Sequence, residues 1–434
     1  MAVRKVVVFM RAYNDVDHLT PVVWKLSTST DVHVTVVMRT GSEFAQDYRI
    51  DFMRTLPRVE VHHIREFLGA AAPVEGEEQI EKSAARPLSM RIRGYFRRLL
   101  GLKRTKPSVK VILEPEPIRE MLATLFSGVD KGLIVFDWVS LAPGSRRFAE
   151  LLCNVGREFG FGNVALPHGD SPYYNKMFKL ADINYTSVEH FGNNPTDVVV
   201  VPNPLTAERY VPFRDDSQLK VLGSARYNKE WMDVLAGIMP VYENPAAAGK
   251  LKLVMFLRNT VFPIFWDEVR TAVRICTQFP DVFLVVKHHT RGGRPDNKHM
   301  ITNEDVSRLN QMSAPNLQVV YNDVHSGSLL AWCDAVLELG TSISFEAIRL
   351  NKPLLALEYL HANVSTVAHY IPSVALNYKD QLYDAIVTLR GNKTLRLYSE
   401  EDRRRFLSQM IDYPDQNVLQ RYVDMLITRL EGKS

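Results

Sequence analysis

The sequence predicts an α/β protein built from two doubly wound domains that face each other across a cleft. The chain of 434 residues is long for one core and suits two domains of about 200 residues each. Short apolar runs of strand length alternate with helical segments in both halves, which is typical of parallel sheets. A polar stretch without strand character, residues 211–217, separates the two series.

The first half begins with a buried strand at residues 5–10, followed by a loop over 11–18 and a helix from about Thr20. Apolar runs rich in β-branched residues predict the other strands of this half. These runs are 32–38, 59–64, 133–136, 164–166, 182–187 and 197–202.

The second half repeats the same alternation and ends in helices at 399–410 and 417–430. Its predicted strands are 219–222, 252–257, 282–286, 317–321, 334–339 and 353–357. The predicted divisions of the chain are a first domain over 1–205 with an insertion at about 86–107, a second domain over 206–400, and C-terminal helices over 401–434.

The composition excludes several classes of protein. A net charge of +4 is too small to indicate nucleic acid as a partner. No apolar run approaches the roughly 18–20 residues that span a bilayer, and the run at 6–10 is too short for a signal peptide. Cys153, Cys276 and Cys333 lie in apolar contexts without metal-ligand spacing, which indicates buried thiols in a reducing cytoplasm.

The strongest functional signal is the stretch 331–357, where residues 334–339 predict a buried strand and 344–350 the start of a helix. The small-residue turn between them offers N–H groups and the positive end of the helix dipole, which together favour an anion. The residues expected to hold a diphosphate there are Gly340, Thr341, Ser342 and Ser344.

This stretch resembles the nucleotide-sugar site of GT-B glycosyltransferases. The features that carry the resemblance are a strand ending in Glu338, the small-residue turn, a helix with Glu346-Ala347, and Lys352-Pro353 before the next strand. The variant is similar to enzymes of bacterial surface-carbohydrate and capsule biosynthesis. The resemblance implies that Glu338 lies near the transferred sugar, that Glu346 binds ribose and that the last helix crosses back to the first domain. The alternative is an ordinary strand–turn–helix unit with solvated glutamates.

Cations follow the predicted strands of the second half. Arg226 comes shortly after one strand, Arg258 ends the next, and Lys287 and Arg291 follow a third. Because parallel strands end at one edge of a sheet, these cations are expected to converge on a diphosphate leaving group. The GT-B resemblance implies this role for Arg258 and Lys287, and His288 is expected to contact the donor.

His168 is the first candidate for the catalytic base. It follows a predicted strand in the sequence Pro-His-Gly-Asp, and an imidazole at a strand end can take a proton from a hydroxyl near neutral pH. The resemblance supports this role, because related transferases carry a His-Gly at such a position. The alternative is a turn histidine that donates to the backbone. Asp137 is the second candidate for the base and Asp15 the third.

Acceptor contacts are expected from Asp17, His18 and Asp170. The Asp15-Val-Asp17 spacing also suits a metal, but Asp17 can equally cap the first helix, and no ligand cluster accompanies it. We therefore expect neither a metal nor a cofactor beyond the donor substrate.

Residues 90–106 alternate Arg or Lys with apolar side chains, a pattern that favours a basic amphipathic helix on an anionic membrane surface. The alternative is a surface helix that packs on its own domain.

The preferred prediction is a metal-independent glycosyltransferase that moves a sugar from a nucleotide-sugar donor to a cell-surface polysaccharide or glycolipid. It would work in the cytoplasm, with the inner face of the membrane as a candidate surface. The alternatives are a polyol-phosphate transferase or a nucleotide-sugar 2-epimerase on the same fold, or a non-catalytic scaffold that docks through residues 90–106.

Overall fold

The structure is a computed structural model of the whole chain. It describes residues 3–11, 13–39, 47–69, 114–137, 143–167, 169, 194–258, 264–289, 304–321, 323–362 and 365–432. The expected strand at 182–187 and the basic segment 90–106 lie outside the described residues.

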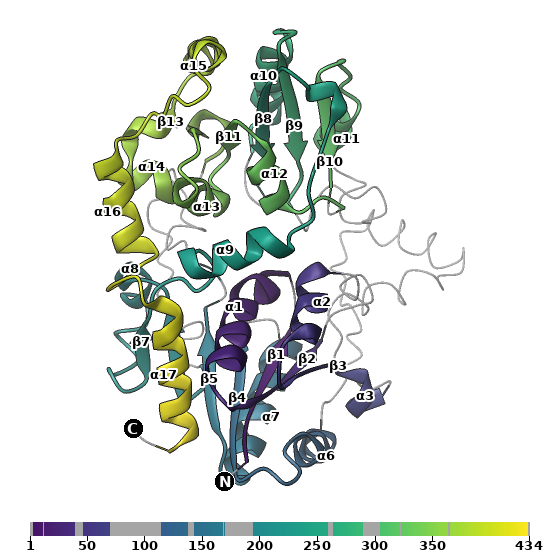
Figure 1. Cartoon of the computed structure of the whole chain (residues 1–434), viewed down its shortest axis with the longest axis vertical. Coiled ribbons are helices and arrows are strands. Elements are labelled where there is room, and N and C mark those ends of the chain that lie inside the picture. The colour runs from purple at the N-terminus through teal and green to yellow at the C-terminus, as the bar shows by residue number, and fades with distance from the viewer. Residues whose placement is uncertain are drawn as a thin grey trace, which may run out of the picture.

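Two parallel sheets organise the described residues, one in each lobe (Figure 1). The first sheet has the strand order β3-β2-β1-β4-β5-β6-β7. Its strands are β1 Arg4–Met10, β2 His33–Met38, β3 Val59–His63, β4 Lys131–Asp137, β5 Gly162–Leu166, β6 Val198–Val201 and β7 Leu219–Val221. The second sheet has the order β10-β9-β8-β11-β12-β13. Its strands are β8 Leu251–Phe256, β9 Val282–Lys287, β10 Leu317–Val320, β11 Ala335–Glu338, β12 Leu354–Leu357 and β13 Ala375–Leu376.

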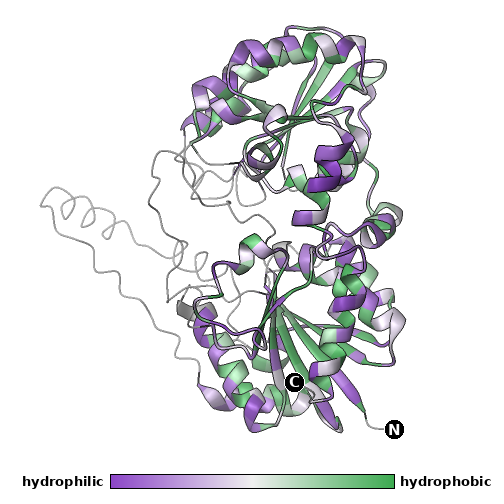
Figure 2. Ribbon diagram, turned by 90° about the vertical axis from the view of Figure 1, so that its left-hand side faces the viewer, coloured by the Kyte–Doolittle hydropathy of each residue, from purple (hydrophilic) through white to green (hydrophobic). Residues whose placement is uncertain are grey.

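Helices connect the strands and cover both sheets (Figure 1). In the first half they are α1 Tyr13–Ser29, α2 Tyr48–Thr55, α3 Arg65–Leu68, α6 Pro115–Leu125, α7 Pro143–Glu158 and α8 Pro204–Ala207. In the second half they are α9 Lys229–Ile238, α10 Trp266–Thr277, α11 Glu304–Asn310, α12 Ser326–Trp332, α13 Ile343–Arg349, α14 Thr366–Tyr370, α15 Lys379–Gly391, α16 Glu400–Met410 and α17 Val418–Leu430. Hydrophobic strands lie at the centre of each sheet, beneath helices with hydrophilic outer faces (Figure 2). The predicted fold class, two doubly wound α/β domains, is confirmed.

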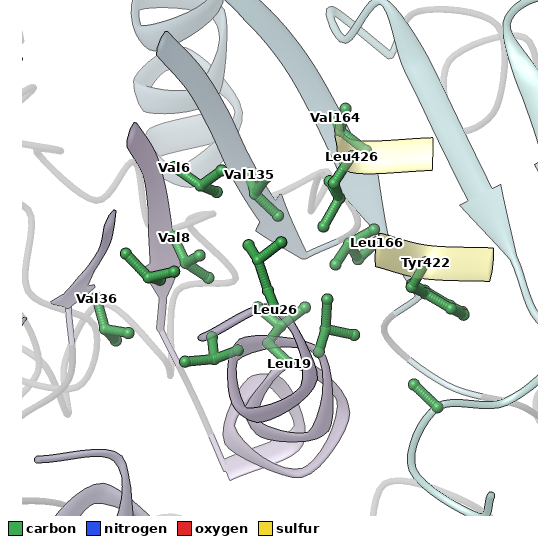
Figure 3. Close-up of a cluster of buried hydrophobic side chains, with 14 of the residues drawn as sticks. Val6, Val8, Leu19, Leu26, Val36, Val135, Val164, Leu166, Tyr422 and Leu426 are labelled. Atoms are coloured by element: carbon green, nitrogen blue, oxygen red, sulfur yellow. The ribbon is translucent and has the colours of Figure 1, made fainter. Parts of the chain in front are cut away.

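The last helix closes the core of the first domain, as predicted. Tyr422 and Leu426 of α17 pack with Leu19 and Leu26 of α1 against the valines and leucines of the central strands (Figure 3). Helix α16 instead packs through Phe406 in the core of the second domain. Only the last of the two C-terminal helices therefore crosses back.

Two expectations for individual elements are wrong. The strand predicted at 219–222 as the first of the second domain is β7, which pairs with β6 at the edge of the first sheet. The division at residue 205/206 stays a prediction, but it does not separate the two sheets. Helix α1 begins at Tyr13 and carries Pro21 inside, although a proline removes one helical hydrogen bond. Asp15, Asp17 and His18 consequently lie within the helix, and Asp17 is not its cap.

The chain crosses between the domains twice, and the two crossings touch. The Ser224 N–H donates to the Ile411 carbonyl at 2.8 Å, and the Asn228 amide donates to the Gln416 carbonyl at 3.0 Å. Gly223 has a φ of +89°, and a Cβ there would lie 2.7 Å from the Ile411 oxygen, so glycine permits this close approach.

The cysteines lie in the cores, as predicted. Cys153, Cys276 and Cys333 are buried and free, and burial raises the pKa of each thiol to about 12. Among the described helices, none is long and apolar enough to cross a membrane.

Candidate functional site

The turn after β11 brings two strand ends of the second sheet together. Gly340 has a φ of +66°, and a Cβ there would lie 2.6 Å from Nη1 of Arg258. That nitrogen donates to the Gly340 carbonyl at 2.7 Å, so the cation that follows β8 is held against the turn. The position therefore needs glycine for two reasons: its φ is positive, and a side chain would collide with the Arg258 guanidinium.

Glu338 is fully buried beneath this turn. Its Oε2 accepts the Thr341 N–H at 2.6 Å, and its Oε1 accepts the Ser365 hydroxyl at 3.1 Å. Burial and, to a smaller extent, the charge of Glu358 together raise the pKa of Glu338 to about 7, against the opposing effect of the Thr341 hydrogen bond. We call Arg258, Glu338, Glu358, His361 and Ser365 the strand-end cluster.

The turn itself is tied down by its own side chains, which differs from the expected open anion site. The Thr341 N–H is taken by Glu338, and the Ser344 hydroxyl donates to the Thr341 carbonyl at 2.8 Å. The Ser342 carbonyl accepts the Tyr227 hydroxyl at 3.1 Å. Helix α13 has seven residues and Ser342 makes no side-chain cap, so the helix dipole contributes little here.

Glu346 faces away from this turn, toward the first domain. Its carboxylate lies beside the start of α12, where a Cβ on Gly327 would be 3.3 Å from Oε1. A small cavity joins it to Asp17 of α1, Arg49 of α2, Arg226 and His325, with α9 forming an apolar wall. We call these five residues the interdomain cluster.

Opposite charges hold the interdomain cluster together. Asp17 pairs with Arg49 and, at 3.3 Å, with Arg226, while Arg49 also pairs with Asp47 at 2.6 Å. Burial alone would raise the pKa of Asp17, but Arg226 and Arg49 hold it well below its usual range. Asp17 is therefore ionised throughout the ordinary pH range.

The same surroundings act differently on Glu346. Burial raises the pKa of Glu346 to about 7, Arg226 opposes this shift, and Asp17 adds to it. Glu346 thus titrates near neutral pH, a property common at functional sites.

The expected cations do not form one group among the described residues. Arg258 belongs to the strand-end cluster and Arg226 to the interdomain cluster. Nζ of Lys287 donates to the Tyr321 carbonyl at 2.5 Å. His288 lies 2.8 Å from the Asn310 side chain and stacks on Tyr321, and burial lowers its pKa. Their convergence on a single diphosphate stays a prediction.

The candidate bases that the structure describes are tied to one arginine. Arg11 forms an ion pair with Asp137 at 2.6 Å, and its backbone N–H donates to Asp15 at 2.7 Å. Both carboxylates are buried, and so is the proposed acceptor contact His18. His168 and Asp170 lie outside the described residues, so their expected roles stay predictions.

Three residues of the interdomain region were not anticipated: Tyr48, Arg49 and His325. The cap of α12 is the His325 side chain, which accepts the Gly327 N–H at 3.2 Å. A histidine cap has a weak sequence signal, because Ser, Thr, Asp and Asn dominate that position. For Arg49, no local pattern indicates a partner 32 residues away.

No protein-family model matches the chain, and no curated protein sequence matches it significantly. Solved structures do match. MnaA from S. aureus in complex with UDP is 13% identical with a TM-score of 0.56, covering 99% of this chain and 97% of its own. The UDP-GlcNAc 2-epimerase from Neisseria meningitidis bound to UDP-GlcNAc is 11% identical with a TM-score of 0.54, covering 98% and 100%. The glycosyltransferase of kitacinnamycin is 13% identical with a TM-score of 0.50, covering 99% and 100%.

These similarities extend over the whole chain and define its class: the protein has a GT-B-like fold. The GT-B resemblance of the sequence is thereby confirmed at the level of fold. The narrower resemblance to capsule-building transferases is not supported by these structures.

Proposed function

We propose that this protein is an enzyme that acts on a nucleotide sugar, with the ribose bound by Glu346 at the junction of the domains. The observation that carries the proposal is a buried carboxyl group with a pKa of about 7 beside Arg226, on a fold shared with proteins crystallised with UDP and UDP-GlcNAc. An ionised carboxylate accepts two hydroxyl donors, as a ribose provides, and such bonds stabilise the charged form.

One candidate reaction is transfer of the sugar to a cell-surface glycan or glycolipid, with His168 as the base that activates the acceptor hydroxyl. Arg226 would stabilise the ionised form of Glu346. Arg258 and Glu338, next to the Gly340 turn, would face the donor sugar and its phosphates.

The other candidate, 2-epimerisation of the nucleotide sugar, has the stronger structural support. The observation that favours it is the similarity to the 2-epimerase, whose TM-score of 0.54 exceeds the 0.50 of the glycosyltransferase. Such a reaction needs no acceptor.

Binding is tested by thermal shift with UDP, CDP, CMP and GDP. A nucleotide at about 100 times its Kd should stabilise the protein by about 2.7 kcal/mol. Glu346→Ala should remove most of this shift, whereas Glu243→Ala, at an exposed glutamate in the same half, should keep it. An unchanged shift in Glu346→Ala would remove the ribose role.

The reaction is tested by product analysis with a panel of nucleotide sugars, with and without acceptor glycans. Glycosyl transfer predicts release of the nucleotide only with an acceptor, and epimerisation predicts an altered sugar nucleotide without one. His168→Ala should abolish transfer and keep the thermal shift. Full turnover in that variant would remove the base assignment.

A further inference from the structure

The two domains meet through a hydrogen bond between Tyr48 of α2 and His325, the residue before α12. Oη of Tyr48 lies 3.1 Å from Nδ1 of His325, and the rings meet edge to face with centroids 5.2 Å apart. The partners are 277 residues apart in the sequence. This bond joins the first domain to the second at the residue that caps α12.

The direction of this bond follows from the helix cap. Nδ1 of His325 accepts the Gly327 N–H at 3.2 Å, and a backbone N–H only donates. Nδ1 therefore carries the single lone pair of the neutral ring, which accepts from both the Gly327 N–H and the Tyr48 hydroxyl. The ring proton then sits on Nε2, which lies 3.9 Å from Oδ1 of Asp17. Burial lowers the pKa of His325, in agreement with a neutral ring.

A second contact crosses the same gap. Asp17 of α1 pairs with Arg226 at 3.3 Å. Arg226 stacks on Tyr227 at 4.9 Å, and Tyr227 belongs to the core of the second domain. Asp17 is thus linked to the second domain through a cation anchored there.

These contacts close over the carboxylate that we assign to ribose. Glu346 is 6% exposed. The cavity beside it has room for little more than one water molecule. A nucleotide sugar therefore needs more room than the closed cluster leaves.

We propose that the Tyr48–His325 hydrogen bond and the Asp17–Arg226 ion pair form an interdomain latch that must open before a nucleotide reaches Glu346. The nucleotide in this statement rests on the proposed function, whereas the latch itself rests only on the contacts. Opening the latch costs free energy that a bound ligand must offset, so weakening the latch should tighten binding.

Tyr48→Phe tests the latch because it removes the donor and keeps the ring. The matched control is Tyr398→Phe, since the Tyr398 hydroxyl donates to the Lys352 carbonyl at 2.8 Å entirely within the second domain. Hydrogen–deuterium exchange of α2 and of the start of α12 is measured in the full-length proteins, together with the Kd for UDP, CDP, CMP and GDP.

A neutral hydrogen bond changes an equilibrium by roughly two- to tenfold. We expect Tyr48→Phe to speed exchange in both segments by this factor and to lower the Kd of the bound nucleotide by a similar factor. Tyr398→Phe should change neither quantity.

Three results would overturn the latch: wild-type exchange in Tyr48→Phe, an unchanged or weaker nucleotide affinity despite faster exchange, or the same effects in Tyr398→Phe. If no nucleotide binds any of the three proteins, the proposed function fails instead. The exchange rates then decide alone whether the interdomain contact holds the domains together.

Discussion

The two glutamates of one strand–turn–helix unit occupy different surroundings. Glu338 and Glu346 are both buried, and burial raises the pKa of each to about 7. The neighbours of Glu338, including Glu358 and Ser365, all come from the second domain. Glu346 instead titrates in the field of charges from both domains, among them Asp17.

One strand–turn–helix unit thus places one carboxyl group within a single domain and the other at the junction of two. The described contacts of the strand-end cluster lie within one domain, so a movement of the domains would leave the cluster intact. The interdomain cluster exists only while the domains are together, so the charge of Glu346 depends on closure. A ligand that needs an ionised Glu346 is thereby coupled to domain position.

The largest expected effect is on the pH dependence of stability. The folded protein binds protons at Glu338 and Glu346 more tightly than the unfolded chain, because both pKa values rise from 4.5 to about 7. The stability from each group is full below pH 4.5 and is lost as the pH rises through 7. Between pH 4.5 and 8, each group should cost the wild-type protein about 3 kcal/mol of unfolding free energy. Glu338→Gln and Glu346→Gln should each lack the decrease that belongs to the substituted group, as measured by urea unfolding across this pH range.

The control variant is Glu243→Gln, because the loss of this exposed carboxyl group should leave the pH dependence of stability unchanged. If the profile of Glu346→Gln matched that of the wild type, the raised pKa and the ribose assignment built on it would both lose their support.

A smaller effect is expected from Gly340→Ala, which disturbs only the strand-end cluster. The new Cβ would displace the Arg258 guanidinium from the Gly340 carbonyl, in addition to the strain of a positive φ. Gly249→Ala introduces the same strain at a φ of +73° with nothing within 4 Å. We expect Gly340→Ala to cost about 2 kcal/mol more than this control in urea unfolding. If Gly340→Ala and Gly249→Ala cost the same, the contact of Arg258 with the Gly340 carbonyl would contribute nothing to stability.

Asp17→Asn should separate the two glutamates. Removing the Asp17 charge lowers the pKa of Glu346, because Asp17 raises it and Arg226 is released toward it. The pH-dependent stability that Glu346 contributes should shrink by about 1 kcal/mol, while that of Glu338 stays constant. The two contributions are measured by unfolding Asp17→Asn alone and in combination with Glu338→Gln or Glu346→Gln. A change at Glu338 would contradict the division into two clusters.

The smallest effect concerns an ion pair at the edge of the same interface. Lys25 of α1 and Glu230 of α9 lie 2.6 Å apart, but the Glu230 side chain is 47% exposed. Because solvent screens such a pair, Glu230→Gln should cost about 0.5 kcal/mol or less and leave the titration of Glu346 unchanged. If thermal unfolding showed a cost above 2 kcal/mol, this exposed pair outside the interdomain cluster would contribute much more to the stability of the protein than we expect.

Much of the fold follows from the sequence because buried parallel strands read as continuous apolar runs. Residues 5–10 and 282–286 predicted β1 and β9 to within one residue at each end. The prediction for the edge strand β7 is wrong about its sheet, because a strand of three residues does not indicate which strand it pairs with. The start of α1 is also mispredicted, because Pro21 lies inside the helix and not in its first turn.

The site was predictable only where it is local. Glu338 and Thr341 interact within three residues of each other, and the small residues between them predict the turn. The surroundings of Glu346 depend on Arg49 and His325, which reach it only through the packing of the two domains. The pairing of Asp137 with Arg11 spans 126 residues and was equally hidden.

The most direct measurement is a crystal structure of the protein grown with UDP or with the nucleotide that gives the largest thermal shift. We expect both ribose hydroxyls within 3.2 Å of the Glu346 carboxylate, and a Tyr48–His325 separation longer than the 3.1 Å of the closed protein. A nucleotide bound away from Glu346, or one bound there with the Tyr48–His325 contact intact, would contradict this expectation.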